Sequence, residues 1–127
     1  MRAKAREVAF QIVFASRFGE AEKGLKTAMY KNLNKDDVEY CERVLSLVEE
    51  HETDFTQILD ERSRAFPESR LFPADKSILL IALAEILHMD DIPFAVSVNE
   101  AANIASKYSS EKSASFISGI LSGVKKV

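Results

Sequence analysis

The stretch 77–87 constrains the fold of this chain most strongly, because it is apolar on almost every side. Its residues 78–84 are seven consecutive apolar side chains. A surface helix shows an apolar stripe, whereas a helix that is apolar nearly all round is buried on most sides. A buried strand is the alternative, but the run to Met89 is too long for a typical strand, and its alanines and Glu85 favour a helix. The sequence therefore predicts a buried central helix at roughly 75–89.

The ends of this central helix carry their own signals. Asp75 stands at the expected N-terminus, where a carboxylate favours the unpaired N–H groups and the helix dipole. Pro93 cannot continue a helix, so the element must end before it. Because a buried helix needs neighbours on all sides, the rest of the chain must supply further helices.

Apolar residues at helical spacing predict those neighbours along the whole chain. The expected helices are 3–17, 20–30, a third capped by Asn34 and ending near His51, a fourth capped by Thr53 or Asp54, a sixth between Pro93 and a break at 108–110, and a seventh capped by Ser110 at about 111–124. The connector 62–75 contains two prolines and separates two helical halves. We therefore predict an all-α fold of about seven helices, in two packed helical halves around the central helix. A length of 127 residues suggests a single domain, 1–127.

Composition excludes several classes of protein. Cys41 is the only cysteine, so an intrachain disulfide is impossible and a cytoplasmic location is expected. No apolar segment typical of a secretory signal follows the charged N-terminus. The longest apolar run is too short to cross a bilayer, so no membrane association is expected.

Residues for catalysis or metal binding are sparse. The sequence has no glycine-rich phosphate loop and no Gly-x-Ser-x-Gly elbow. Cys41, His51 and His88 lie on different expected elements, so a buried structural cysteine is favoured over a Cys–His nucleophile pair, which sequence alone leaves open. His88 with Asp90 and Asp91 could touch a metal, but a histidine at a helix end is the commoner case. We expect a binding protein that is not an enzyme and uses no cofactor or metal.

The charges are distributed unevenly along the chain. Residues 1–17 hold four cations against one acid, and residues 107–126 also hold four against one, whereas 35–61 hold ten acids against two cations. If the two basic ends meet in the fold, they form a positive patch that is a candidate polyanion site. Charge alone favours the simpler interpretation, a solvated face.

Three aromatic residues stand apart from the main apolar stripes of their helices. Phe10 and Phe14 lie beside basic residues on the first helix, an arrangement that suits single-stranded nucleic acid, although a role in the core is favoured for both. Phe116 lies beside the core stripe of the last helix, next to Gly119 and Gly123. Each glycine costs about 1 kcal/mol relative to alanine in a helix, which suggests close approach of another helix or a ligand.

Several blocks of this sequence resemble the NusB family of bacterial transcription antitermination factors. Residues 5–14 read AREVAFQIVF and resemble the family's A-R-E-x-A-(L/V)-Q-x-L-Y. Residues 91–93 read DIP and 96–101 read VSVNEA, similar to (D)-(V/I)-P and (V)-x-(I)-N-E-A. Residues 105–108 read ASKY and 116–121 read FISGIL, similar to (L)-A-K-x-(Y/F) and F-(V)-N-G-(V/I)-L. The blocks occur in the family's order and spacing.

The resemblance implies both a fold and a function. The fold would be all-helical, with seven helices in two halves. The function would be binding of a boxA RNA element in a heterodimer with the tenth small-subunit ribosomal protein, known as NusE. The two proteins load onto the RNA polymerase elongation complex and suppress termination, especially in ribosomal RNA operons. Some family members form homodimers that cover the RNA-binding face, so the sequence leaves both a monomer and a homodimer open.

The resemblance also assigns residues. An arginine-rich N-terminal segment contacts RNA in the family, and Arg2, Lys4 and Arg6 match it. The phenylalanine of the last block, a family RNA contact, is Phe116. Two positions depart from the pattern, because Ser118 stands where asparagine is usual and Lys112 stands where some relatives are acidic. The expected RNA-binding residues are Arg2, Lys4, Arg6 and Lys112 at phosphates, Phe116 stacked on a base, and Ser118.

Asp75 and Phe94 are the residues expected near the NusE interface, because one begins the central helix and the other follows the proline that ends it. Two other functions stay open. The basic N-terminal segment is thinner than in the family, which fits a helical protein–protein adaptor with weak or lost RNA binding. The chain could also be a stand-alone relative of the NusB-like domain of ribosomal RNA cytosine methyltransferases.

Overall fold

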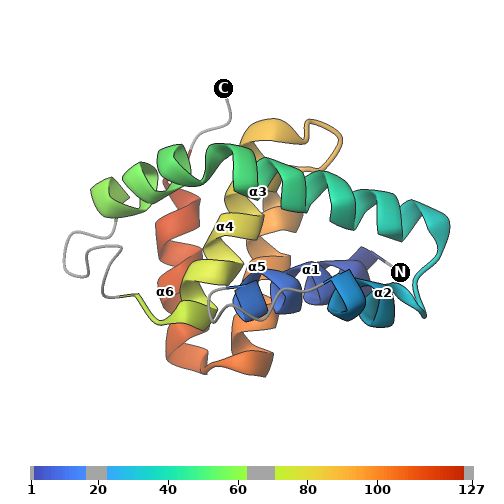
Figure 1. The fold of residues 1–127 in the computed structure, drawn as a ribbon. Coiled ribbons are helices and arrows are strands. Elements are labelled where there is room, and N and C mark those ends of the chain that lie inside the picture. The colour runs from blue at the N-terminus through green and yellow to red at the C-terminus, as the bar shows by residue number, and fades with distance from the viewer. Residues whose placement is uncertain (1, 17–22, 63–70, 125–127) are drawn as a thin grey trace.

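The computed structural model describes residues 2–16, 23–62 and 71–124, which form six α-helices and no strand (Figure 1). The helices are α1 (Arg2–Ser16), α2 (Lys23–Tyr30), α3 (Lys35–Arg62), α4 (Pro73–His88), α5 (Phe94–Tyr108) and α6 (Glu111–Ser122). The predicted all-α class is confirmed. The start of the second expected helix, the end of the first at Arg17 and most of the connector 62–75 lie outside the described residues.

The third and fourth expected helices are one continuous element, α3. Its backbone leaves helical geometry at His51, where φ is −111° and ψ is 15°. The sequence therefore predicted the position of the interruption correctly. It was wrong in predicting two separate helices, because the chain only kinks at this point and continues as helix. This kink accounts for six helices in place of about seven.

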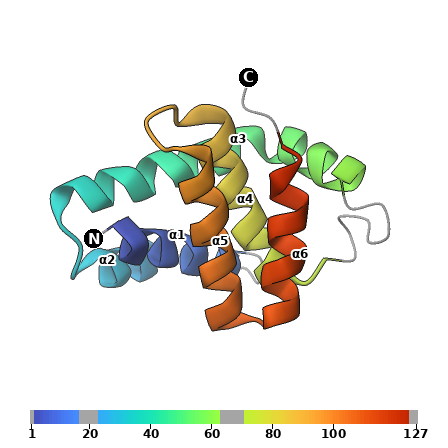
Figure 2. The same ribbon diagram turned by 180° about the vertical axis from the view of Figure 1, so that it is seen from behind.

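The predicted central helix is α4, and it starts two residues earlier than expected. Pro73 occupies its first turn, where the missing N–H of proline leaves no hydrogen bond unmade. Every residue from Ser77 to Ile86 is buried. The helix packs against α1, α3, α5 and α6, and the two views show α3 crossing one side of it while α5 and α6 cover the other (Figures 1 and 2). The apolar surface on all sides of α4 is thus used by four neighbours.

Two of the predicted helix caps are confirmed. The Asn34 side-chain oxygen accepts a hydrogen bond from the Asp37 amide at 2.8 Å, at the start of α3. The Ser110 hydroxyl accepts one from the Ser113 amide at 3.0 Å, at the start of α6. Each cap satisfies an amide that the first turn of a helix leaves without an intrahelical partner.

Asp75 lies in the first turn of α4 as predicted, but it makes a different contact from a cap. Its carboxylate accepts a hydrogen bond from the Ser113 hydroxyl at 3.1 Å, and the residue is only 4% exposed. This bond connects the start of α4 to the start of α6.

Among the described helices, none is both long and apolar enough to span a membrane.

Candidate nucleic-acid interface

Arg6 is the expected RNA-binding residue whose position is most informative. It is 5% exposed, and its Nε donates to Glu85 Oε2 at 2.7 Å. Burial disfavours the charged guanidinium, but the hydrogen bond and the charge of Glu85 outweigh it, so the pKa of Arg6 is raised. With its Nε bonded to Glu85 and only 5% of the residue exposed, Arg6 has little surface to offer a phosphate. The placement of Arg6 therefore argues against the predicted phosphate contact.

The Glu85 carboxylate is the centre of a buried polar network. The Tyr40 hydroxyl donates to the same oxygen as Arg6, and the Ser97 hydroxyl donates to Oε1 at 2.8 Å. Burial and the charge of Glu85 raise the pKa of Tyr40, so its hydroxyl stays a donor. Because Arg6, Tyr40, Glu85 and Ser97 belong to α1, α3, α4 and α5, the network joins four helices and fixes α1 in place.

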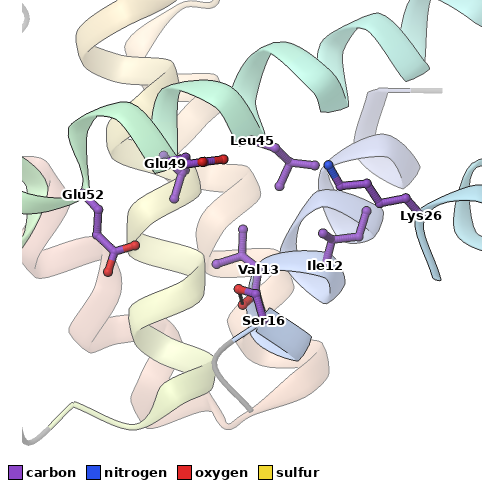
Figure 3. Close-up of a pocket in the computed structure, with 8 residues that line it drawn as sticks. Ile12, Val13, Ser16, Lys26, Leu45, Glu49 and Glu52 are labelled. Atoms are coloured by element: carbon purple, nitrogen blue, oxygen red, sulfur yellow. Dashed lines mark hydrogen bonds between the residues drawn. The ribbon is translucent and has the colours of Figure 1, made fainter. Parts of the chain in front are cut away.

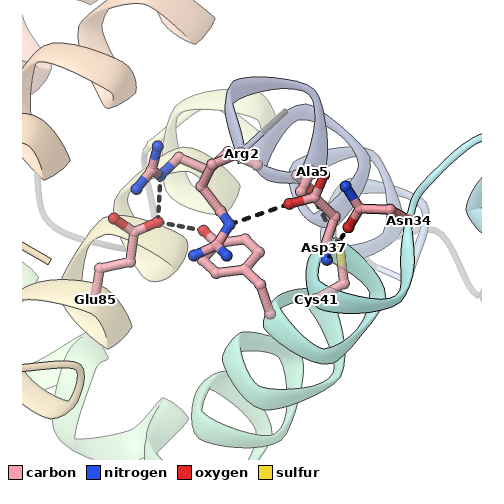
Figure 4. Close-up of polar contacts among 8 residues, drawn as sticks. Arg2, Ala5, Asn34, Asp37, Cys41 and Glu85 are labelled. Atoms are coloured by element: carbon pink, nitrogen blue, oxygen red, sulfur yellow. Dashed lines mark hydrogen bonds and ion pairs between the residues drawn. The ribbon is translucent and has the colours of Figure 1, made fainter. Parts of the chain in front are cut away.

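Arg2 and Lys4 lie on the same helix and retain access to solvent. Arg2 Nε is 3.2 Å from Asp37 Oδ1, and the guanidinium lies 4.8 Å from the centre of the Tyr40 ring (Figure 4). Its side chain is still 40% exposed. Lys4 is exposed. These two residues, without Arg6, are the cations that α1 presents on its first two turns.

The other expected contacts lie on α6. Lys112 is exposed, Phe116 is half-buried and packs against the core, and Ser118 is half-buried. Gly119 is exposed, and a Cβ atom built there would meet nothing within 4 Å. The fold therefore does not require glycine at this position. Phe116 offers part of its ring to solvent while the rest contributes to packing.

The helices that carry these cations are not direct neighbours at the start of α1, because α5 lies between that end of α1 and α6 (Figure 2). The C-terminal half of α5 lies between them and carries Lys107, which the sequence counted among the cations of the basic C-terminal end, and Tyr108, which it named only within the ASKY block. Lys107 Nζ donates to Glu7 Oε1 at 2.6 Å, and this bond raises the pKa of Lys107. Gln11 donates to the Tyr108 hydroxyl at 3.1 Å, and Tyr108 is 38% exposed. The signal for these residues was the ASKY block, which resembles a family motif.

Two aromatic side chains of α1, Phe10 and Phe14, lie near the contact between α1 and the C-terminal end of α5. Phe10 is 3% exposed, and its ring centre lies 5.1 Å from that of Tyr108 and 5.9 Å from that of Phe14. The favoured core role of Phe10 is confirmed, and Phe14 is half-buried beside it. The Tyr108 ring thus contacts Phe10, its hydroxyl is bonded by Gln11, and Lys107 Nζ lies 5.4 Å from its centre, while the residue keeps 38% of its surface exposed.

Asp75 and Phe94, the two residues expected near a protein partner, lie at opposite ends of α4. One is in the first turn of that helix and the other begins α5 after α4 has ended. Sixteen helical residues span about 24 Å, so the two do not belong to one small patch. Asp75 is the more unusual residue, because burial raises its pKa and its Oδ1 has no hydrogen-bond partner within the described part of the chain. Phe94 is half-buried.

A groove of about 360 Å³ lies between α1 and α3, on the side of α1 that faces away from α5 (Figure 3). Its walls include the carboxylates of Glu49 and Glu52 and the amine of Lys26. Exposed acids continue along α3, so this side of the molecule repels polyanions. The surface formed by α1, α5 and α6 is the better candidate for nucleic acid.

The structure also bears on the nucleophile and metal alternatives. Cys41 is fully buried and donates to the Ala5 carbonyl at 3.3 Å, and burial raises the pKa of its thiol to about 12, whereas a nucleophile needs a lowered value. The His51 and His88 rings are stacked, with centres 4.1 Å apart, and in the residues that the structure describes no group of three or more His, Cys, Asp or Glu could hold a metal ion. The sequence thus predicted the buried, structural role of Cys41 correctly.

Comparison with known proteins identifies the family. The model of the NusB family matches residues 3–126. Among curated proteins, the transcription antitermination protein NusB of Finegoldia magna is 34% identical over 98% of this chain and 93% of its own length. NusB of Acetivibrio thermocellus is 35% identical over 99% of this chain and 89% of its own length.

Solved structures show the same fold. T. maritima NusB superposes with a TM-score of 0.88 at 26% identity, covering 96% of this chain and 88% of that one. A crystal structure of antitermination factors NusB and NusE in complex with double-stranded RNA gives a TM-score of 0.82 at 24% identity, covering 95% and 92% of the two chains. The match over nearly the whole chain, with the helical core and the recurring sequence blocks, shows that this chain belongs to the NusB family of transcription antitermination proteins, which is not a family of enzymes.

Proposed function

We propose that this chain is an antitermination factor that binds single-stranded boxA-type RNA together with NusE and acts on the RNA polymerase elongation complex at ribosomal RNA operons, in the cytoplasm. The observation that carries the proposal is the surface formed by α1, α5 and α6. Exposed cations lie at both of its edges, and Tyr108 and Phe116 offer aromatic surface between and beside them. The resemblance of the fold to NusB bound to NusE and RNA supports this assignment.

The chemistry of this surface suits a single strand. Arg2 and Lys4 on α1 and Lys112 on α6 would neutralise phosphates, which supplies affinity without sequence preference. Phe116 and Tyr108 would stack on bases, as aromatic side chains do in proteins that bind single strands. Ser118 has a hydroxyl that can donate to either a phosphate or a base. Arg6 acts indirectly in this proposal, since its bond to Glu85 holds the helix that carries Arg2 and Lys4.

The partner protein would contact a separate part of the surface. One carboxylate oxygen of Asp75 is buried and has no hydrogen-bond partner among the residues that the structure describes, and the neighbouring Phe72 is 70% exposed. An exposed aromatic ring beside an unsatisfied acceptor is typical of a surface that a partner covers. We therefore place NusE near the start of α4, and Phe94 remains a second candidate position at the far end of that helix.

Measurement of RNA affinity against salt concentration tests the proposal. If Arg2, Lys4 and Lys112 neutralise about three phosphates, the logarithm of the binding constant falls with the logarithm of salt concentration at a slope of about −2, from about −0.7 per phosphate. Lys4→Ala should weaken binding to all RNAs similarly and bring the slope closer to zero by about 0.7. Lys35→Ala, at the exposed start of α3, is the matched control and should change neither. A boxA-like RNA that binds with no salt dependence would contradict the assignment.

The adaptor function is the second candidate, and the burial of Arg6 favours it. Of the three expected N-terminal cations, Lys4 is exposed, Arg2 is half-buried and paired with Asp37, and Arg6 is buried, so the electrostatic contribution of α1 is smaller than the sequence suggested. The same titrations discriminate the two functions. An adaptor would bind NusE but show no measurable RNA affinity with or without it, whereas the proposed factor binds RNA better with NusE present, because the partner adds contacts. A stand-alone relative of the methyltransferase domain would bind ribosomal RNA without NusE. Analytical ultracentrifugation would separately show whether the protein forms a homodimer.

A further inference from the structure

A small groove between α1 and α5 crosses the proposed RNA-binding surface. It has a volume of about 290 Å³, close to the lower limit of roughly 300 Å³ for pockets that bind small molecules, which suits a single nucleobase. The residues that line it are Ala3 and Glu7 of α1 and Glu100, Asn103, Ile104 and Lys107 of α5. The groove lies between the two groups of cations, because α5 separates the start of α1 from α6 (Figure 2).

The register of the two helices is fixed by contacts at one end of the groove. Lys107 Nζ donates to Glu7 Oε1 at 2.6 Å, and one turn further along α1 Gln11 donates to the Tyr108 hydroxyl at 3.1 Å. Asn103 and Glu100 lie one and two turns before Lys107 on α5, respectively, so they line the groove beyond the Glu7–Lys107 pair. Lys4, which is exposed, lies one turn before Glu7 on α1.

The groove is acidic, although the proposed ligand is a polyanion. Glu7 is matched by Lys107. Glu100 makes no side-chain hydrogen bond or salt bridge within the part of the chain that the structure describes, although its charge acts on Arg6 and helps to raise the pKa of that guanidinium. A carboxylate repels phosphate, so the sugar–phosphate backbone would pass along the cations at the edges and stay out of the groove. A base carries no charge and can enter. The acidic lining therefore selects bases over phosphates.

The available side chains define which base fits. An ionised carboxylate only accepts hydrogen bonds, and its two oxygens accept from two adjacent donors. Guanine presents two adjacent donors, N1–H and N2–H, on its Watson–Crick edge. Adenine and cytosine present one donor beside an acceptor that faces the carboxylate, and uracil presents one N–H between two carbonyls. Proteins that recognise single-stranded RNA read splayed-out bases on this edge.

We propose that the groove between α1 and α5 binds one guanine base of the RNA, with the Glu100 carboxylate accepting from its N1–H and N2–H. Asn103 supplies an amide to the remaining polar atoms of the base, and Ile104, 5% exposed at the groove, offers apolar surface to the ring. Tyr108 lies at the end of the groove, where a neighbouring base stacks on its exposed surface. This inference rests on the proposed RNA-binding function and adds a sequence preference to it.

Fluorescence anisotropy with short RNAs tests the inference on the unmodified protein. The probes are an all-uridine decamer, the same decamer with one central guanosine, and the same decamer with inosine, which lacks the N2 amino group. A bidentate contact predicts that the guanosine probe binds about fivefold or more tightly than the all-uridine probe, and that inosine loses most of this advantage. Equal affinity for the three probes would overturn the inference and leave the proposed function intact, whereas no binding to any of them would overturn both.

The variant Glu100→Gln separates base recognition from a simple charge effect. Glutamine keeps the size of the side chain but offers one acceptor oxygen, so the preference for guanosine should disappear, while binding of the all-uridine decamer stays the same or becomes tighter as a negative charge is lost. If the variant binds all probes more tightly in equal proportion, Glu100 only repels RNA and the inference is wrong. Glu61→Gln, in the exposed last turn of α3, makes the same charge change elsewhere and should leave the preference unchanged. Thermal melting of both variants checks that the fold is retained.

Discussion

Replacement of Arg6 by methionine tests whether this residue holds the helices together or contacts RNA. The side chains of Arg6 and Glu85 are 7% and 1% exposed, so the variant leaves a carboxylate buried without its countercharge. Removal of one partner from a buried ion pair costs about 3–5 kcal/mol of unfolding free energy. Because Tyr40 and Ser97 still donate to the Glu85 carboxylate, we expect a loss near the lower value, about 3 kcal/mol.

Urea denaturation followed by circular dichroism measures this loss. If the unfolding free energies of the two proteins fall with urea concentration at the same slope, both proteins expose the same amount of surface on unfolding. Adding Glu85→Gln to Arg6→Met removes the buried charge, and we expect the double-mutant cycle to give a coupling energy of about 1–3 kcal/mol. If Arg6→Met changes stability by less than 1 kcal/mol and lowers RNA affinity in a folded protein, then Arg6 is a phosphate contact and the structural reasoning fails.

Substitutions at three further positions test local features. Ser110→Ala removes the cap of α6 and should lower the free energy of unfolding by about 0.5–2 kcal/mol, whereas Ser110→Asn keeps a capping oxygen and should retain most of the stability; equal melting temperatures for the two would contradict the cap. Gly119→Ala should raise stability by about 0.5–1 kcal/mol, because a Cβ there meets no atom within 4 Å, and a lower melting temperature would show that the helix surface is more crowded than described. Phe116→Ala should cost about 1–3 kcal/mol of folding, less than the 3–5 kcal/mol of a fully buried phenylalanine, together with about 1–3 kcal/mol of RNA binding; a variant that melts normally and binds RNA normally would remove Phe116 from both roles.

The helices themselves could be predicted from the sequence because their signals are local. The all-round apolar character of α4 required a buried helix, and the caps at Asn34 and Ser110 depend only on residues three positions away. The break near His51 was also visible, but its size was not. A kink and a chain reversal differ by the packing of the following helix against the core, which adjacent residues do not encode.

The candidate site was predicted less well than the fold. Lys4 and Lys112 are exposed as expected, and Phe116 is partly available. Lys107 was counted among the cations of the C-terminal end, but its bond to Glu7 and the bond of Tyr108 to Gln11 were not predicted, because these partners lie about 100 positions earlier in the chain. Only the packing of α5 across α1 brings these residues together.

Arg6 shows most clearly where sequence stops and tertiary structure begins. The sequence by itself determined an all-α protein around one buried helix, the positions of two caps and the basic character of both chain ends, since helical periodicity and net charge are properties of neighbouring residues. It could not show that one of those cations would be buried, because the carboxylate that pairs with Arg6 is 79 positions away and meets it only when α1 packs on α4. Burial, and therefore whether a charge stabilises the core or binds a ligand, was decided by the tertiary structure alone.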